Sequence, residues 1–342
     1  MALLEVEDLK TRFQTDDGVV NAVDGVSFTL DRGKTLGIVG ESGSGKSVTC
    51  LTILGLNDPR NTTSEGVARF DGVDLLRTDP ESLRQLRGMR ISMIFQDPMT
   101  SLNPVKKIGW QLEEAVLVHR DVSHKEARQL ALAAMESVRI PRAAQRIDDY
   151  PHQFSGGMRQ RVMIAMALIN EPALLIADEP TTALDVTTQA QILDLIRELQ
   201  AERGTAVILI THDLGVVAET ADDIVVMYAA RIAEHAPVFS LFERPMHPYT
   251  WGLLGSLPRL DVELERLTQI KGQPPSLLRP PAGCRFRPRC AHAFDRCRSE
   301  LPEATPAGFD AGHLDACFLA EVRKLEESAR IVAELGLDEE AA

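Results

Sequence analysis

A short glycine-rich segment near the N-terminus constrains this chain more than any other feature. It runs Gly40-Glu41-Ser42-Gly43-Ser44-Gly45-Lys46-Ser47, and we call it the phosphate loop. Glycines let backbone N–H groups approach a phosphate, Lys46 supplies positive charge for the β- and γ-phosphates, and the Ser47 hydroxyl suits Mg²⁺. Residues 35–39 before it predict a buried strand, and residues 47–53 predict a helix whose N-terminus favours anions. The segment therefore predicts a nucleoside triphosphate site.

Composition limits the class of protein. The chain has 342 residues, 44% of them hydrophobic and 25% charged, which is typical of a globular protein with one large domain and an appendage. It contains no apolar run of membrane-spanning length and does not begin like a signal peptide, so we expect it in the cytoplasm. A net charge of −13 and 5% aromatic residues argue against nucleic-acid binding.

Apolar segments alternate between strand-like and helical spacing along the first 250 residues. Beyond the elements around the phosphate loop, we predict helical spacing over 108–139 and 187–203, and strands over 3–6, 20–23, 26–30, 91–95, 174–177, 207–210 and 224–227. A hairpin turn is predicted at 16–18. This alternation predicts an α/β fold with a mostly parallel sheet covered on both faces, interrupted by a helical block between Gln96 and about Val162.

The character of the chain changes after Arg244. Prolines become frequent, so long helices are not expected there until the apolar helical spacing of residues 316–337. Four of the five cysteines lie in this tail.

Two acids follow the predicted strand 174–177. Asp178 at its tip is placed to hold Mg²⁺ through water, and Glu179 could polarise an attacking water molecule as general base.

Between these elements, Phe154-Ser155-Gly156-Gly157-Met158 precedes an apolar helix. A serine and two glycines at a helix N-terminus offer donors to a phosphate. In this order and spacing the chain resembles the ATP-binding-cassette (ABC) family, whose signature loop has Leu and Gln where this chain has Phe154 and Met158. The resemblance implies a P-loop NTPase fold with a RecA-like core, an antiparallel β subdomain and an inserted α-helical subdomain. It implies an ATPase domain over 1–255, with the helical subdomain at about 97–162, and a Pro/Cys-rich extension over 256–342.

The resemblance also assigns roles to single residues. Gln96 corresponds to the γ-phosphate-sensing Q-loop, Asp185 in Ala183-Leu184-Asp185 to the D-loop that reaches a second ATPase chain, and His212 to the switch histidine. Catalysis is then expected from Glu179, His212, Lys46 and Gln96, and Mg²⁺ binding from Ser47, Gln96 and Asp178. The expected nucleotide contacts are Phe13 (by stacking on adenine), Gly40, Ser42, Gly43, Ser44, Gly45, Lys46, Ser47, Val48, Gln96, Asp178, Ser155, Gly156, Gly157 and Asp185.

Three further segments resemble one subgroup, the ATPases of dipeptide and oligopeptide importers: residues 97–104, 150–153 and 247–250. This implies ATP-driven peptide uptake with a homologous second ATPase and two membrane permease subunits, served indirectly by an extracytoplasmic solute-binding protein. The chain would then lie at the cytoplasmic face of the plasma membrane. The alternatives are the same role in an importer for nickel or another small solute, a soluble ABC ATPase acting on ribosomes or DNA, and a non-catalytic regulatory cassette.

The tail cysteines Cys284, Cys290, Cys297 and Cys317 have the spacing C-x5-C-x6-C-x19-C. In a reducing compartment clustered thiols favour metal ligation over free thiols or disulfides, but this spacing fits no standard zinc or ferredoxin pattern. Residues 283–290 resemble the C-terminal motif of the peptide-importer ATPases, which implies a [4Fe–4S] cluster, with zinc as the alternative. Cys50 stands apart and is expected to be a small buried residue.

Overall fold

The computed structural model describes residues 2–97, 101–182, 184–256 and 270–336, which form two compact units. The first unit consists of Met1–Leu3, Leu30–Thr35 and Arg77–Ile210, and the second of Leu4–Thr29, Leu36–Leu76 and Thr211–Ala342.

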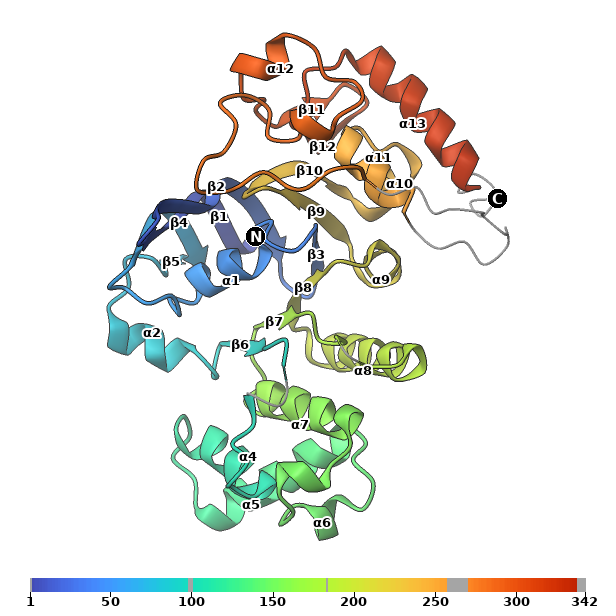
Figure 1. Cartoon of the computed structure of the whole chain (residues 1–342). Helices are drawn as coiled ribbons and strands as arrows, with labels where there is room; N and C mark the ends of the chain where they lie inside the picture. Colours follow the sequence, from blue (N-terminus) through green and yellow to red (C-terminus); the bar gives the residue numbers. More distant parts are fainter. Residues whose placement is uncertain (1, 98–100, 183, 257–269, 337–342) are drawn as a thin grey trace. The chain divides into compact units, whose positions relative to one another are not determined.

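Three parallel strands form the centre of the first unit, in the order β8 (Ala206–Thr211), β7 (Leu174–Asp178), β6 (Ile91–Ile94). Every residue of β7 and β8 is buried, as expected for parallel strands covered on both faces. The helices of this unit are α2 (Pro80–Leu86), α4 (Ile108–Leu117), α5 (His124–Ser137), α6 (Ala143–Arg146), η1 (Pro151–Gln153), α7 (Gly156–Leu168) and α8 (Val186–Arg203). Helices α4 to α7 group together, in green in Figure 1.

The helical spacing predicted for 108–139 corresponds to two helices rather than one. Helix α5 starts at a capping box in which the Ser123 hydroxyl accepts the Glu126 N–H at 3.2 Å, and the Glu126 carboxylate accepts the Ser123 N–H at 2.8 Å. These reciprocal bonds satisfy N–H groups that a continuous helix would pair with carbonyls of the preceding turn.

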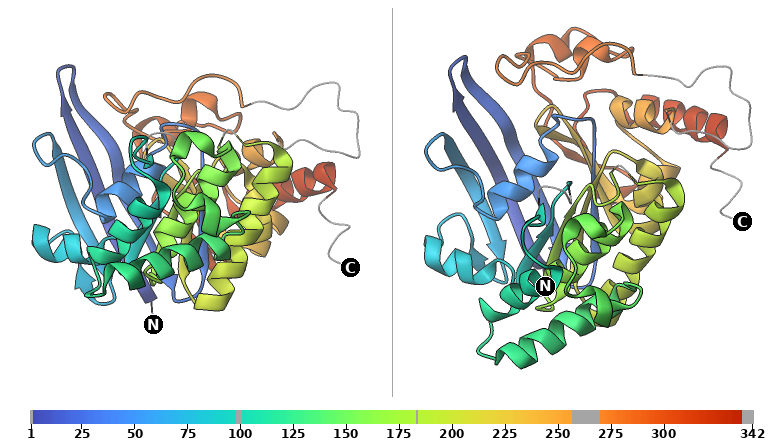
Figure 2. Two further views of the ribbon diagram at one scale, coloured as in Figure 1. Left: turned by 90° about the horizontal axis from the view of Figure 1, so that it is seen from below. Right: turned by 60° about the horizontal axis from the view of Figure 1, so that its bottom comes forward.

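The second unit contains two sheets. One has the order β2 (Gly18–Asp31), β1 (Ala2–Thr15), β4 (Thr62–Phe70), β5 (Val73–Asp74), and its strands lie side by side in blue in Figure 2. The other has the order β11 (Thr305–Ala307), β12 (Asp310–Asp315), β10 (Arg231–Pro237), β9 (Asp223–Tyr228), β3 (Thr35–Val39), with β3 and β9 parallel and the remaining pairs antiparallel. The helices here are α1 (Lys46–Ile53), α9 (Leu214–Thr220), α10 (Val238–Glu243), α11 (Pro248–Leu254), η2 (Arg287–Arg289), α12 (Arg296–Ser299) and α13 (Glu321–Leu335).

The predicted strands 20–23 and 26–30 are parts of one strand, β2. Asp24-Gly25 between them resembles a turn, but it stays inside the strand because the Asp24 N–H donates to Ala230 O at 2.8 Å. Gly25 provides the left-handed backbone angle, φ 77°, that this irregular position requires.

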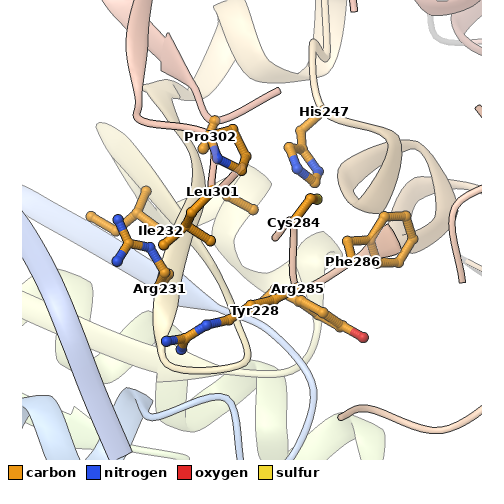
Figure 3. Close-up of a pocket in the computed structure, with 11 residues that line it drawn as sticks. Tyr228, Arg231, Ile232, His247, Cys284, Arg285, Phe286, Leu301 and Pro302 are labelled. Atoms are coloured by element: carbon orange, nitrogen blue, oxygen red, sulfur yellow. The ribbon is translucent and has the colours of Figure 1, made fainter. Parts of the chain in front are cut away.

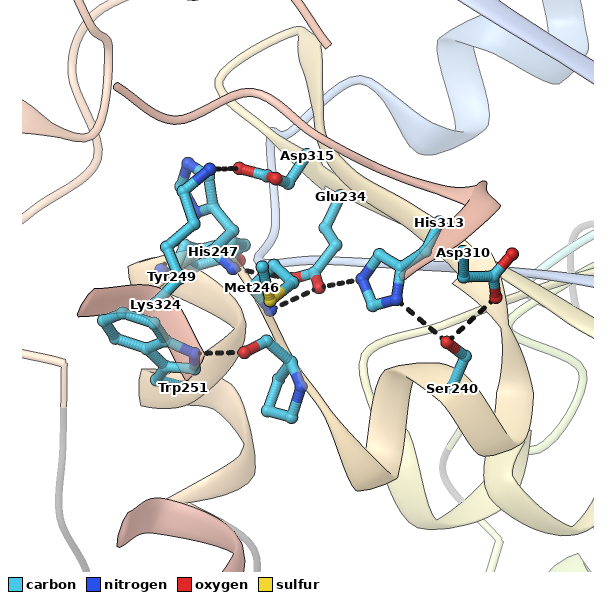
Figure 4. Close-up of polar contacts among 11 residues, drawn as sticks. Glu234, Ser240, Met246, His247, Tyr249, Trp251, Asp310, His313, Asp315 and Lys324 are labelled. Atoms are coloured by element: carbon cyan, nitrogen blue, oxygen red, sulfur yellow. Dashed lines mark hydrogen bonds and ion pairs between the residues drawn. The ribbon is translucent and has the colours of Figure 1, made fainter. Parts of the chain in front are cut away.

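A buried carboxylate joins the C-terminal extension to the rest of the second unit. Glu234 on β10 is fully buried, and its Oε1 lies 2.6 Å from His313 Nε2 on β12 and accepts the Met246 N–H at 2.6 Å (Figure 4). Its Oε2 accepts the His247 N–H at 3.0 Å. Burial lowers the pKa of His247 to about 4, which keeps its Nδ1 free to accept the Tyr249 N–H at the start of α11. The extension is therefore anchored by a polar network as well as by strand pairing.

Glu234→Gln is expected to lower the free energy of unfolding by about 3 kcal/mol, because an amide nitrogen replaces one oxygen that accepts buried donors. Denaturant unfolding followed by intrinsic fluorescence measures this change. Glu243→Gln, at an exposed position in α10, is the matched control and should be neutral. Equal stability of the two variants would contradict the anchoring role of Glu234.

Candidate active site

The phosphate loop connects β3 to α1, as predicted, and its conformation requires glycine at two positions. Gly40 has φ 152°, and a Cβ there would lie 2.1 Å from Met227 O. Gly45 has φ 104°, and a Cβ there would lie 2.5 Å from Ala22 O. Because both obstacles are backbone atoms, no side-chain rearrangement could make room for a larger residue.

The loop also carries groups suited to phosphate. The Lys46 ammonium is buried and donates to the carbonyls of Gly40 at 2.7 Å and Glu41 at 3.1 Å. The Ser44 hydroxyl is buried and has no hydrogen-bond partner among the described residues. Helix α1 begins without a side-chain cap and without an acidic residue in its first turn. A buried hydroxyl without a partner in the described part of the chain and a buried cation next to a glycine cradle fit the phosphates of a nucleotide.

The other predicted contacts of the loop differ in exposure. Ser42 and Gly43 are exposed, whereas Ser47 and Val48 are half-buried in the first turn of α1. A Cβ at Gly43 would meet nothing within 4 Å.

The acidic end of β7 lies in the first unit, where two of the predicted catalytic residues, Glu179 and Gln96, are in contact. Asp178 is the buried last residue of the strand, and Glu179 follows it with φ 45°. The Glu179 N–H donates to Ile210 O at 2.9 Å, and its Oε2 accepts Gln96 Nε2 at 2.8 Å and Thr182 Oγ1 at 2.9 Å. The Glu179 carboxylate is thereby held in one orientation. Thr182 was not predicted as part of the site, although its position three residues after Glu179 was a usable signal.

The signature and D-loop residues have local capping roles in the first unit. Ser155 is exposed and caps α7, where its hydroxyl accepts the Met158 N–H at 3.3 Å. Asp185 is exposed and caps α8, where its carboxylate accepts the Thr188 N–H at 2.9 Å and hydroxyl at 2.7 Å. These bonds hold the pKa of Asp185 below its usual range. Ala183 and residues 98–100 of the predicted motifs lie outside the described residues.

Glycines 156 and 157 open α7 directly after Ser155. A Cβ at Gly157 would lie 2.9 Å from Cγ2 of Thr188, whereas Gly156 has only a distant neighbour at 3.9 Å. Gly156 is therefore exposed, whereas Gly157 is half-buried.

His212 and Phe13 belong to the second unit, like the phosphate loop. His212 directly follows β8 and is exposed. Phe13 lies near the end of β1, half-buried and opposite Thr62 of β4.

The four tail cysteines line one cavity, which we call the cysteine cavity. Its wall also includes Phe286, Phe294, Phe318 and two histidines, His247 and His292. All four thiols are free, so they are not paired as disulfides. Burial raises the pKa of Cys290 to about 11 and that of Cys317 to about 12, and it raises the pKa of Cys284 as well. Cys50 lies apart, fully buried in α1 as expected.

An adjacent pocket shares Cys284, His247 and Phe286 with the cysteine cavity. In Figure 3 Cys284 and His247 point toward each other above Tyr228 and Arg285. Within the part of the chain that the structure describes, no three His, Cys, Asp or Glu side chains are positioned to hold a single metal ion.

None of the helices within the described ranges combines the length and the apolar character needed to cross a lipid bilayer.

Comparisons with known proteins identify the family of the chain. Residues 23–182 match the family model described as ABC transporter, and residues 233–297 match the C-terminal region of oligopeptide/dipeptide transporters. The chain is 52% identical to the oligopeptide transport ATP-binding protein OppD of Salmonella typhimurium, over 92% of this chain and 93% of the relative. It is 51% identical to the dipeptide transport ATP-binding protein DppD of Bacillus subtilis, over 94% of this chain and 96% of the relative.

A solved structure of an ATP-binding cassette, dimeric and bound to ADP and Pi after hydrolysis, superposes with a TM-score of 0.62 at 27% identity. The superposed region is 69% of this chain and 98% of the cassette. Motifs, fold and relatives converge: the chain belongs to the ABC transporter ATPases, in the oligopeptide/dipeptide importer family.

Proposed function

We propose that this ABC ATPase powers the uptake of dipeptides or oligopeptides through membrane permease subunits. The observation that carries the proposal is the match of residues 233–297 to the C-terminal region of oligopeptide/dipeptide transporters, together with relatives named for peptide transport. Uptake of nickel or another small solute by the same ATPase mechanism is the alternative, because an ATPase subunit need not contact the cargo.

The proposed chemistry is hydrolysis of the γ-phosphate of ATP by positioning and charge neutralisation. Lys46 and the loop N–H groups would hold the β- and γ-phosphates. The carboxylate of Glu179, oriented by Gln96 and Thr182, would accept a proton from the attacking water. His212 would donate a hydrogen bond to the γ-phosphate.

Mg²⁺ would be held by three residues of this chain. Ser47, Asp178 and Gln96 offer a hydroxyl, a carboxylate and an amide oxygen, which are the ligand types that Mg²⁺ prefers. When bound, the ion would neutralise phosphate charge. Phe13 would stack on the adenine, since it is half-buried and near the end of its strand.

Two ATPase chains would share their sites. The exposed Ser155, Gly156 and Asp185, with Gly157, would act on the nucleotide held by a second, homologous chain. The dimeric, ADP-bound state of the similar cassette supports this arrangement.

We further propose that the ATPase domain covers residues 1–255 and the extension 256–342. The chain would bind two permease subunits at the cytoplasmic face of the membrane and depend indirectly on a solute-binding protein.

For the cysteine cavity we propose a [4Fe–4S] cluster. Four thiolates are the ligands of such clusters, and all four line a common cavity. Zinc, which also accepts four thiolates, is the alternative. Among the described residues no three such side chains are positioned around one metal ion, so the proposal rests on the shared cavity and on the resemblance of residues 283–290. When bound, the cluster would cross-link a proline-rich extension that has little core of its own.

The uptake proposal is tested in cells of the source organism whose gene copy carries Lys46→Ala. Uptake of a labelled dipeptide, a labelled pentapeptide and nickel is compared with that of unmodified cells. Loss of peptide uptake alone supports the proposal, whereas loss of nickel uptake alone favours the alternative. Lys10→Ala, at a half-buried position on β1, is the control and should leave all three unchanged.

Cys290→Ser is expected to remove the bound metal. Anaerobically purified unmodified protein should contain about four irons per chain and show a broad visible absorption band, and the variant should lose both. Cys50→Ala, outside the cavity, should keep them. One zinc per chain would establish the zinc alternative, and a metal-free unmodified protein would leave the cysteines as free thiols.

A further inference from the structure

The C-terminal extension makes a direct ionic contact with the phosphate loop. Arg289, the residue directly before Cys290, donates from Nη1 to Glu41 Oε2 at 2.6 Å and from Nη2 to Glu41 Oε1 at 2.9 Å. The two parallel bonds form a bidentate pair, the strongest geometry for arginine and a carboxylate. The Arg289 side chain is only 4% exposed, and further bonds to the carbonyls of Lys271 at 3.0 Å and Ile270 at 3.1 Å fix its guanidinium.

Glu41 is a loop residue that binds the catalytic lysine. Its carbonyl accepts Lys46 Nζ at 3.1 Å, and its N–H donates to Tyr249 Oη at 2.9 Å. Because Arg289 holds the side chain of the same residue, the position of this part of the loop depends on the extension.

A second arginine of the same segment, Arg285, is connected to the phosphate loop indirectly. Arg285 donates to Ala229 O and to the Asp24 carboxylate. The next residue, Ala230, donates its N–H to Ser44 O at 2.9 Å within the phosphate loop. Between the two arginines, Phe286 packs edge-on against Tyr228, with ring centroids 5.2 Å apart. The stretch from Cys284 to Cys290 thus contacts the phosphate loop through Arg289 and the neighbouring residue Ala229 through Arg285.

The charges make this contact relevant to nucleotide binding. Glu41 places a carboxylate within the loop that receives the phosphates, where an unpaired negative charge would repel them. Arg289 neutralises that charge; its side chain is 4% exposed and that of Glu41 is 28% exposed, so salt screens this partly buried pair less than it screens a surface pair.

We infer that Arg289 is a positioning residue for MgATP and that it couples the cysteine segment 284–290 to the phosphate loop through Glu41. This inference rests on the proposed ATP site but not on the identity of the group in the cysteine cavity. Coupling between two sites is reciprocal, so nucleotide binding should in turn stabilise the segment that carries Cys284 and Cys290.

The first test measures MgATP affinity and turnover in full-length variants. Arg289→Gln should weaken MgATP binding about tenfold, with a smaller change in kcat, because the carboxylate of Glu41 is left unpaired near the phosphates. Adding Glu41→Gln should restore binding to within about threefold of the unmodified protein, since the double variant no longer carries that charge. A merely structural role of Arg289 would give no such rescue. Arg298→Gln, an exposed arginine in α12, is the matched control and should bind MgATP normally.

The second test follows hydrogen exchange of the amides in residues 284–290. MgATP should slow this exchange in the unmodified protein and have no effect on it in Glu41→Gln. If Arg289→Gln does not fold, Arg289→Lys and Glu41→Gln carry the test: the lysine keeps the charge without the bidentate geometry and should give an intermediate affinity.

Any one of three results would overturn the inference. The first is unchanged MgATP affinity in Arg289→Gln, and the second is a double variant whose MgATP affinity is not restored by Glu41→Gln. The third is hydrogen exchange in Glu41→Gln that still responds to MgATP. An unmodified protein that does not bind MgATP would instead overturn the proposed function, so the two failures are distinguishable.

Discussion

Glu179→Gln is expected to lower the rate of ATP hydrolysis by about 10²- to 10⁴-fold while MgATP still binds. The carboxylate that Gln96 and Thr182 hold in place is the group we assign to proton transfer from water. Glutamine has the same shape and can still accept the Thr182 hydroxyl, but it cannot take up a proton. With hydrolysis blocked, two chains should remain associated around ATP.

Steady-state phosphate release and size-exclusion chromatography with and without MgATP measure both effects. Glu202→Gln, at an exposed position on α8, controls for the loss of one negative charge and should behave like the unmodified protein. A Glu179→Gln variant with the unmodified rate would refute the assignment of Glu179 as general base.

Gly40→Ala is expected to abolish MgATP binding. The added Cβ would lie 2.1 Å from a backbone oxygen of β9, so either the loop or the strand must move. Gly43→Ala provides the comparison within the same motif. Gly43 also has a left-handed backbone angle, φ 76°, but open space surrounds it. Gly43→Ala should therefore lower the free energy of unfolding by only about 1–2 kcal/mol, which is the cost of a left-handed backbone angle for alanine.

Isothermal titration with MgATP and thermal unfolding of the two alanine variants measure the contrast. Similar nucleotide affinities in Gly40→Ala and Gly43→Ala would mean that the close contact with β9 does not control the loop.

The nucleotide machinery was the most predictable part of this chain because each of its elements is local in sequence. The phosphate loop follows β3 and opens α1, and the acids end β7, as the apolar runs and their neighbours indicated. The match to the ABC transporter model and to peptide-transport relatives confirmed the predicted family and fold.

The contacts of the extension could not be predicted, because they join residues far apart in the chain. Arg289 and Glu41 are separated by 248 positions, and nothing in the local pattern of either indicates the other. Strands β10 and β12 were missed for a different reason. They carry buried charged and polar residues, such as Glu234 and His313, which interrupt the apolar alternation that identifies a strand.

Strand β12 has a consequence for how this protein avoids self-association. A sheet ending at β10 would present unpaired backbone groups along its last strand, and such edges pair readily with other chains. Here β12 covers that edge, and the outermost strand, β11, is only three residues long and contains Pro306, which has no N–H to offer. The extension thus ends the sheet in a strand that is a poor template for aggregation.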